Sequence, residues 1–297
     1  MSRGLGDVYK RQTYNRANTI GRTYEYLCKQ TLRSFEWIIV DDGSTDNTEE
    51  IVQKWINTNK ISIVYLKQEN GGKHRAFNRA VQIAKGEIFI CLDSDDYYIE
   101  TALEIIYSYH LIHKDNPWIA GFSCNSLDLH GNLIGTSLPV DELVVSHYNL
   151  YNSLSVKGDK GLIYYTRILK EYPFPEFENE FFVTEALVLN RISLRYKICC
   201  IKRSLEIKDY QRDGLSSKYR HLCLRNPNGY ALYINERDYF NLSFTNYVIN
   251  AASYVRYSLF AGKSFRNIYK EAINRRWTFI IACFLGILLY IKDKSRS

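Results

Sequence analysis

Acidic residues cluster directly after a short apolar run in the first third of the chain. The run Ile88–Leu92 is followed by the sequence D-S-D-D at 93–96. An apolar run of this kind predicts a buried strand whose carboxyl end carries carboxylates. Carboxylates there can bind a hard cation, Mg²⁺ or Mn²⁺, which shares its other sites with water and substrate phosphates. The alternative is that these acids are solvated at the start of the helix expected from Thr101.

Further polar clusters stand at other expected strand ends and turns. They are Thr13, Tyr14, Asn15 and Arg16; Asp41 and Asp42; and the segment N-G-G-K-H-R at 70–75. The carboxyl ends of parallel strands meet at one edge of an open α/β sheet, where ligands bind. The clusters can therefore converge on one ligand.

The residue types suit a nucleoside diphosphate. Asp42 could accept a hydrogen bond from the imide N–H of uracil, and Tyr14 could stack on the base. Lys73 or Arg75, near the start of a helix, could hold a diphosphate by charge and by helix-end N–H groups. Each residue also has a structural alternative: Asp42 as a turn former, and the two basic residues as solvated charges. Their joint occurrence in this order favours the binding site.

The elements that position these clusters alternate along the chain. Apolar runs predict strands over 35–40, 61–66, 88–92 and 119–124, and helical spacing predicts helices over 18–30, 74–85 and 101–113. Alternation with short connections predicts an α/β fold, a mostly parallel sheet flanked by helices.

Residues 1–12 show neither the helical nor the strand period and resemble translated adapter read-through. We therefore expect a non-native leader and a missing first strand; the alternative is a native flexible tail.

The charge and cysteine content of the chain limit the classes of partner it can bind. The 297 residues carry a net charge of +7, without the dense basic runs interleaved with aromatics that are typical of nucleic-acid binding. A mild basic excess suits anionic substrates or an anionic membrane face. The seven cysteines include no C-x-x-C pair. They are interpreted as reduced thiols of a cytoplasmic protein.

Four motifs together resemble family 2 glycosyltransferases with the GT-A, Rossmann-like fold. They are T-Y-N-R-A at 13–17, V-D-D-G-S-T-D-N-T at 40–48, N-G-G-K-H-R-A-F-N-R-A at 70–80 and G-E-I-F-I-C-L-D-S-D-D at 86–96. The resemblance implies transfer from a nucleotide-sugar donor, mostly with inversion at the anomeric carbon. It places Asp42 at the nucleotide base, Asp93 at the ribose and Asp95 on the divalent metal. Among nucleotides, UDP is weakly preferred.

The resemblance extends more weakly to residues 181–188. Relatives carry an E-D pair there, whose acid is the candidate catalytic base; here the pair is Thr184-Glu185, so only Glu185 can fill that role. The alternative is an acid favoured by the helix dipole at a helix start. Asp159 is the second candidate for the base. Arg212 and Lys218 could close over the diphosphate, or belong to a solvated loop.

The resemblance and the patterns divide the chain into a leader at 1–12, a GT-A domain at 13–220 and a helical region at 221–297. The segment 277–291 carries no charge and is flanked by basic residues. As a helix it would be about 22 Å long, short of the ~30 Å hydrocarbon core, so shallow insertion is expected rather than a crossing. We expect a peripheral location on the inner membrane face. A buried helix or an oligomer contact is the alternative.

The overall prediction is a metal-dependent, inverting glycosyltransferase that adds one sugar to a polysaccharide or lipid-linked glycan. The Q-x-x-R-W motif of processive synthases is absent from the sequence, which favours single addition. Two alternatives stay open: a non-catalytic relative that binds nucleotide-sugars, and a sugar-phosphate nucleotidyltransferase. The second is disfavoured because no Gly-rich phosphate loop follows a strand near the N-terminus.

Overall fold

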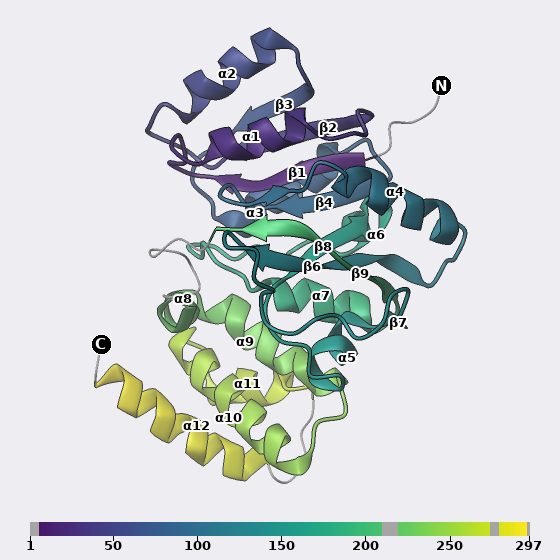
Figure 1. The fold of residues 1–297 in the computed structure, drawn as a ribbon. Coiled ribbons are helices and arrows are strands. Elements are labelled where there is room, and N and C mark those ends of the chain that lie inside the picture. The colour runs from purple at the N-terminus through teal and green to yellow at the C-terminus, as the bar shows by residue number, and fades with distance from the viewer. Residues whose placement is uncertain (1–5, 210–218, 274–278, 296–297) are drawn as a thin grey trace. The chain divides into compact units, whose positions relative to one another are not determined.

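The computed structural model describes residues 6–209, 219–273 and 279–295, with side chains described from Thr13 onward (Figure 1). The chain forms two compact units. Unit 1 comprises residues 1–173 and 189–212, and unit 2 comprises residues 174–188 and 213–297. Unit 1 contains the sheet, and unit 2 is helical.

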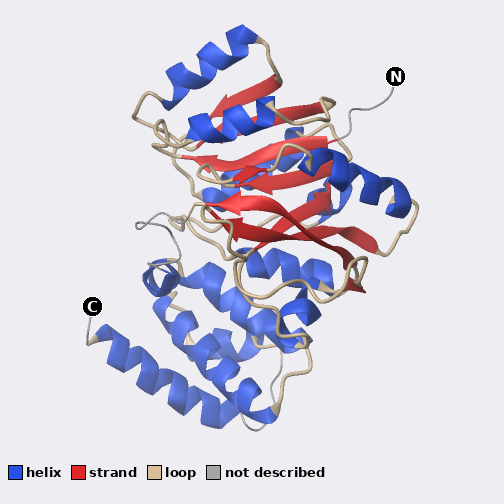
Figure 2. Cartoon of the chain, in the orientation of Figure 1, coloured by secondary structure: helices blue, strands red, loops and turns tan. Residues whose placement is uncertain are grey.

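One mixed sheet organises unit 1. Within the described residues it has nine strands, in the order β3-β2-β1-β4-β8-β6-β9-β5, with β7 paired to β9. The strands are β1 (Gly6–Thr13), β2 (Phe35–Asp41), β3 (Ser62–Lys67), β4 (Ile88–Leu92), β5 (Tyr97–Tyr98), β6 (Ile119–Asp128), β7 (Val144–Val145), β8 (Lys160–Tyr165) and β9 (Lys197–Lys208). Helices flank this sheet, which confirms the expected α/β class (Figure 2).

The sheet is parallel from β3 to β4 and mixed beyond β4, where β6 and β9 again pair in parallel. Strands β3, β2, β1 and β4 run parallel, whereas β8 is antiparallel to both β4 and β6. Strand β4 is an apolar strand buried along most of its length, as its sequence predicts. Because β1, β2 and β4 share one direction, their carboxyl ends meet at one edge: Thr13 aligns with Asp41, and Lys10 with Leu92.

The expectation of a missing first strand is wrong. Residues Gly6–Thr13 form β1, which pairs in register with β2 on one side and β4 on the other. These residues lack the alternating or apolar pattern of a strand, so β1 is defined by its backbone pairing. The central position of the sheet is therefore filled.

The helices of unit 1 alternate with its strands along most of the chain. They are α1 (Ile20–Cys28), α2 (Thr48–Thr58), α3 (Lys73–Ile83), α4 (Ala102–His113), α5 (His147–Asn152) and α6 (Thr166–Glu171). Tyr24 of α1 stacks on Trp55 of α2 with ring centroids 4.3 Å apart, and Trp55 lies 6.0 Å from Trp37 of β2. These rings join both helices to the sheet.

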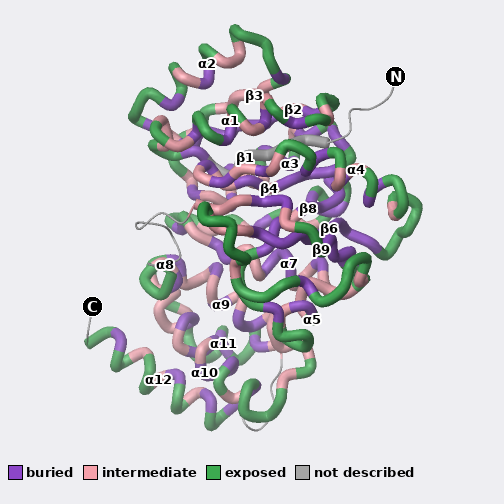
Figure 3. The backbone as a smooth tube through the Cα atoms, viewed as in Figure 1, coloured by how far each residue is buried: buried purple, intermediate pink, exposed green. Residues whose placement is uncertain are grey.

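Unit 2 is built from helices packed on one another. Helix α7 (Glu185–Ser193) contributes residues to both units. The other helices are α8 (Tyr219–Arg225), α9 (Pro227–Glu236), the 3₁₀ turn η2 (Arg237–Tyr239), α10 (Phe244–Phe260), α11 (Phe265–Glu271) and α12 (Phe279–Lys294). Its core includes Ala231, Tyr247, Ala251, Val255 and Ile268. In Figure 3 buried residues follow the strands of unit 1 and one side of the helices of unit 2.

A proline in β1 tests whether this segment fills the centre of the sheet. Val8→Pro removes a backbone N–H from a strand paired on both sides, so we expect a loss of about 2 kcal/mol or more in unfolding free energy. Thermal unfolding followed by circular dichroism measures it. A melting temperature of Val8→Pro equal to that of the parent would contradict the assignment of β1.

Candidate functional site

Asp42 follows β2 and is buried. Its Oδ1 accepts hydrogen bonds from Gln68 Nε2 (2.7 Å) and the Gly71 amide (2.8 Å), and its Oδ2 accepts from the Gly72 amide (2.9 Å). Gly72 has φ +88°, a conformation that favours glycine. The carboxylate thus fixes the turn that leads into α3. Its contact with a nucleotide base stays a prediction, and any such contact would share a carboxylate already used by the turn.

The turn held by Asp42 places Lys73 at the sheet edge that carries Asp93 and Asp95, which we call the acidic edge. Lys73 is the first residue of α3, and its Nζ lies 3.7 Å from Asp93 Oδ1. Both side chains keep some solvent access, 21% and 30% exposed, so the pair adds little stability and can exchange for a ligand. Arg75 instead donates to the Gly71 carbonyl at 2.7 Å. The structure therefore brings together two of the predicted residues, Lys73 and Asp93, and gives Arg75 a role in the turn.

The acids of the D-S-D-D turn differ in burial. Asp93 and Asp95 are half-buried, whereas Asp96 is buried and its Oδ2 lies 3.1 Å from Lys208 Nζ. Lys208 also pairs with the buried Glu206 at 3.2 Å. Burial raises the pKa of Asp96 to about 7, against the opposing charge of Lys208. Asp93 and Asp95 thus remain accessible, and Asp96 anchors the turn.

The anchor draws on two further elements. The Thr23 hydroxyl of α1 donates to the Asp96 carbonyl at 2.9 Å, and the amide of Asp209 donates to Asp96 Oδ1 at 3.0 Å. Asp209 in turn pairs with Arg22 of α1 at 2.8 Å. Sequence reasoning missed Lys208, which lies far from the D-S-D-D turn in the sequence.

The Thr13–Arg16 turn lies beside Asp42. The Thr13 carbonyl accepts from the Asp42 amide at 2.9 Å, while the buried Thr13 Oγ1 has no hydrogen-bond partner among the described residues. Tyr14 is 44% exposed, so its ring is accessible to a ligand. The Arg16 amide donates to Thr48 Oγ1 at 3.3 Å, which ties the turn to the start of α2. The predicted base-binding turn therefore adjoins the end of β2.

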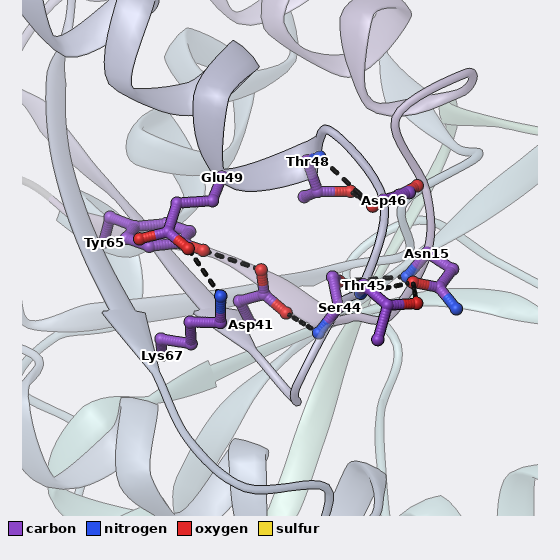
Figure 4. A network of polar contacts seen from close by, with 9 residues as sticks. All are labelled: Asn15, Asp41, Ser44, Thr45, Asp46, Thr48, Glu49, Tyr65 and Lys67. Atoms are coloured by element: carbon purple, nitrogen blue, oxygen red, sulfur yellow. Dashed lines mark hydrogen bonds and ion pairs between the residues drawn. The ribbon is translucent and has the colours of Figure 1, made fainter.

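Two acids of the D-D-G-S-T-D motif are structural (Figure 4). Asp41 accepts from the Ser44 amide at 2.7 Å and from the Tyr65 hydroxyl at 2.6 Å. Asp46 accepts from the Thr48 hydroxyl at 2.5 Å and from the amides of Thr48 (3.1 Å) and Ala17 (3.0 Å). These hydrogen bonds outweigh burial and lower the pKa of Asp46. In the same network Asn15 Oδ1 accepts from the Thr45 amide, and Glu49 pairs with Lys67. These contacts hold the loop after β2 in one conformation.

The acidic edge fits a cation shared with a ligand. Among the described residues no group of three or more His, Cys, Asp or Glu side chains could enclose an ion. Asp93 and Asp95, one residue apart at the end of β4, supply two accessible carboxylates. Mg²⁺ is commonly held by one or two carboxylates together with waters and substrate phosphates. The two acids suit that arrangement rather than a cage made by protein alone.

Glu185 is the first residue of α7 and is half-buried. The segment before it is tied to the start of α9, because Glu180 accepts from the amides of Asn228 (2.6 Å) and Gly229 (2.9 Å). Asn226 Oδ1 accepts from the Phe181 amide at 2.7 Å. Glu185 thus follows a rigidly held segment of unit 2, and its role as the base stays a prediction.

The remaining sequence candidates are Asp159, Arg212 and Lys218. Asp159 is exposed in the residues before β8, and its role also stays a prediction. Arg212 and Lys218 lie outside the described residues.

Replacing Lys208 tests the anchor of the acidic turn. Lys208→Met leaves the buried carboxylates of Asp96 and Glu206 without their shared cation, which should cost about 3–5 kcal/mol of unfolding free energy. Chemical denaturation at pH 8 measures it. Lys54→Met breaks an exposed pair with Glu50 and should change stability by less than about 1 kcal/mol. If the two variants unfold alike, Lys208 does not anchor the turn.

Comparisons with known proteins agree with this geometry. Residues 12–127 match the model of glycosyl transferase family 2. Glycosyltransferase GlyG of Streptococcus pneumoniae is 34% identical over 138 residues, 44% of this chain and 45% of the relative. Poly(ribitol-phosphate) beta-N-acetylglucosaminyltransferase TarS of Staphylococcus aureus is 31% identical over 194 residues, 61% of this chain and 32% of TarS. The chain thus spans less than half the length of these curated relatives.

Solved structures share the fold. The structure of S. aureus TarS 1-349 with UDP-GlcNAc has a TM-score of 0.63 at 19% identity, over 98% of this chain and 91% of that one. The mannosyltransferase PcManGT from Pyrobaculum calidifontis, with GDP-Man and Mn²⁺, has a TM-score of 0.55 at 16% identity, over 99% and 89%. Residues 12–127 thus match glycosyl transferase family 2, and the solved neighbours show that the chain shares their GT-A fold.

Proposed function

We propose that the chain is a glycosyltransferase that moves one sugar from a nucleotide-sugar donor to a polysaccharide or lipid-linked glycan acceptor, with inversion. The observation that carries the proposal is the edge where Lys73 meets Asp93 beside the accessible Asp95. A departing diphosphate carries negative charge that must be neutralised. A lysine can do so directly, and accessible carboxylates can hold a cation that does the same. The match to glycosyl transferase family 2 supports this reading.

The donor roles follow the order of the strand ends. Asp42 and Tyr14 would bind the base, and Thr13 and Arg16 would also contact the donor nucleotide. Asp93 would face the ribose and Lys73 the diphosphate. A UDP-sugar is the preferred donor, supported by the TarS neighbours with UDP-GlcNAc and with UDP. The helix α3 would add its N-terminal N–H groups to the phosphate contacts.

Asp95 would hold Mg²⁺ or Mn²⁺. The bound cation supplies charge neutralisation of the departing diphosphate. The neighbour solved with GDP-Man and Mn²⁺ supports this choice. The buried Asp96 would contribute by keeping the turn, and therefore both outer carboxylates, in place.

Glu185 would act as the base. Its carboxylate takes the proton of the acceptor hydroxyl as that oxygen forms a bond to the sugar C1. The bond from C1 to the diphosphate oxygen breaks, and its electron pair leaves with the nucleoside diphosphate. One base is sufficient for a single displacement of this kind.

We also propose a peripheral location on the cytoplasmic face of a membrane, supported by the apolar composition of α12.

Neutralising Asp95 tests the metal assignment. In Asp95→Asn we expect UDP-GlcNAc to lose its Mn²⁺-dependent thermal stabilisation, because the amide is a poor ligand for a hard cation. Differential scanning fluorimetry with Mn²⁺, and again with EDTA, measures it. Asp115→Asn changes an exposed acid of unit 1 and should retain the full shift. A Mn²⁺-dependent shift that survives in Asp95→Asn would contradict the assignment.

Replacing Glu185 separates catalysis from binding. Glu185→Gln removes the proton acceptor but keeps the size of the side chain, so we expect transfer to fall by about 10²–10⁴-fold while donor stabilisation persists. Release of UDP in the presence of a glycan acceptor measures the turnover. Glu178→Gln, an exposed acid of unit 2, is the matched control. Unchanged turnover in Glu185→Gln would refute its role, and donor stabilisation without turnover in the parent would indicate a non-catalytic binding protein.

A further inference from the structure

Helix α12 is apolar almost throughout, yet only one side of it packs within unit 2. Phe279, Ala282 and Gly286 are buried on that side. A Cβ atom on Gly286 would lie 2.6 Å from the Ala252 carbonyl oxygen and 2.7 Å from Val255 Cβ, both on α10. The glycine therefore permits a backbone approach that a larger residue would block. This contact fixes which face of α12 is turned outward.

A buried ion pair near the end of α12 fixes the same orientation. Asp293 is buried and pairs with Arg220 of α8 at 3.0 Å and with Arg256 of α10. It is the only acid in the sequence from 277 to 297. The outward face of α12 consequently carries no negative charge.

That outward face is formed by large apolar side chains. Ile280, Phe284 and Leu288, at intervals of four residues, are 64%, 68% and 63% exposed. The complete set of exposed apolar residues on the helix is Ile280, Ile281, Phe284, Leu285, Leu288, Leu289 and Ile291. We call these seven residues the α12 outer face. Large apolar side chains exposed together on one helix of a folded protein mark an interaction site.

The ends of the helix carry the residue types found at membrane interfaces. Lys292 and Lys294 are exposed, and Lys294 Nζ lies 5.6 Å from the centre of the Tyr290 ring. At the other end Tyr269 of α11, 54% exposed, contacts the ring of Phe279. Tyrosines favour the boundary between lipid and water, and lysines favour anionic headgroups.

The length of α12 favours a helix that lies along the membrane–water interface over one that crosses the bilayer. Among the helices in the described part of the chain, none is both long and apolar enough to span a bilayer. The 16 residues of α12 would extend about 24 Å, against the ~30 Å of a hydrocarbon core. A helix held along one side by α10 can present the other side to lipid without leaving unit 2.

We infer that the α12 outer face docks on an anionic lipid bilayer, with the helix lying in the membrane plane. The two lysines and the absence of an outward acid complement anionic headgroups. A second copy of the chain would present the same basic, acid-free face and offer no partner for these lysines. The inference specifies the surface behind the proposed peripheral location, and it does not depend on the transfer reaction.

Vesicle binding of the full chain tests the inference. We expect the protein to sediment with vesicles of phosphatidylcholine and phosphatidylglycerol in equal amounts, and less with phosphatidylcholine alone. Phe284→Ser with Leu288→Ser should lower the partition coefficient at least about tenfold, because two large side chains no longer enter lipid. Leu111→Ser with Ile112→Ser, exposed apolar residues of α4, is the matched control and should bind as the parent does.

Lysine variants separate charge from apolar contact. Lys292→Ala with Lys294→Ala should reduce binding to the anionic vesicles several-fold and leave binding to neutral vesicles unchanged. Melting temperatures and stabilisation by UDP-GlcNAc, measured on every variant, show whether the fold and the donor site persist, which separates failure of docking from failure of the proposed transferase.

Three outcomes would overturn the inference. The parent could fail to bind anionic vesicles, or the Phe284 and Leu288 double variant could bind as tightly as the parent. Light scattering could instead reveal a dimer that the double variant dissociates, which would assign the α12 outer face to a second copy.

Discussion

The arrangement of the candidate site depends on one buried carboxylate. Asp42, at the end of β2, satisfies the side-chain amide of Gln68 and the backbone N–H groups of Gly71 and Gly72. A buried carboxylate is costly unless such donors surround it, and here three of them do. The same bonds set where α3 begins, and so place Lys73 within 3.7 Å of Asp93. Strand β2, helix α3 and the end of β4 are coupled through this residue.

Burial separates acids that look alike in the sequence. Asp41 and Asp96 are buried with hydrogen-bond or ion-pair partners, and they hold loops in place. Asp93 and Asp95 occupy the same type of strand end but keep solvent access, which a ligand or cation requires. A cluster of acids at the end of a strand thus combines anchoring and binding. The neighbour that anchors it, Lys208, comes from β9, far along the chain.

Local pattern explains which parts of this fold the sequence could predict. Strand β4 spans the predicted Ile88–Leu92, because an apolar run bounded by a glycine and acids is a local signal. Strand β1 was missed because its sequence, with Asp7, Lys10 and Arg11, lacks the apolar pattern of a central parallel strand. The antiparallel course of β8 and the pairing of Lys208 with Asp96 arise from contacts between distant segments. The motifs could be located in the sequence, but the hydrogen bonds by which Asp41 and Asp46 hold the loop after β2 are known only from the structure.

Hydrogen–deuterium exchange of the full chain with UDP-GlcNAc and Mn²⁺ tests most directly whether the strand ends form the donor site. We expect slower exchange in two segments, the 93–96 turn and the start of α3 at 73–76, because a bound diphosphate would cover both. The effect should disappear when EDTA replaces Mn²⁺. If saturating donor leaves both segments unchanged while other segments become protected, the donor does not bind at these strand ends.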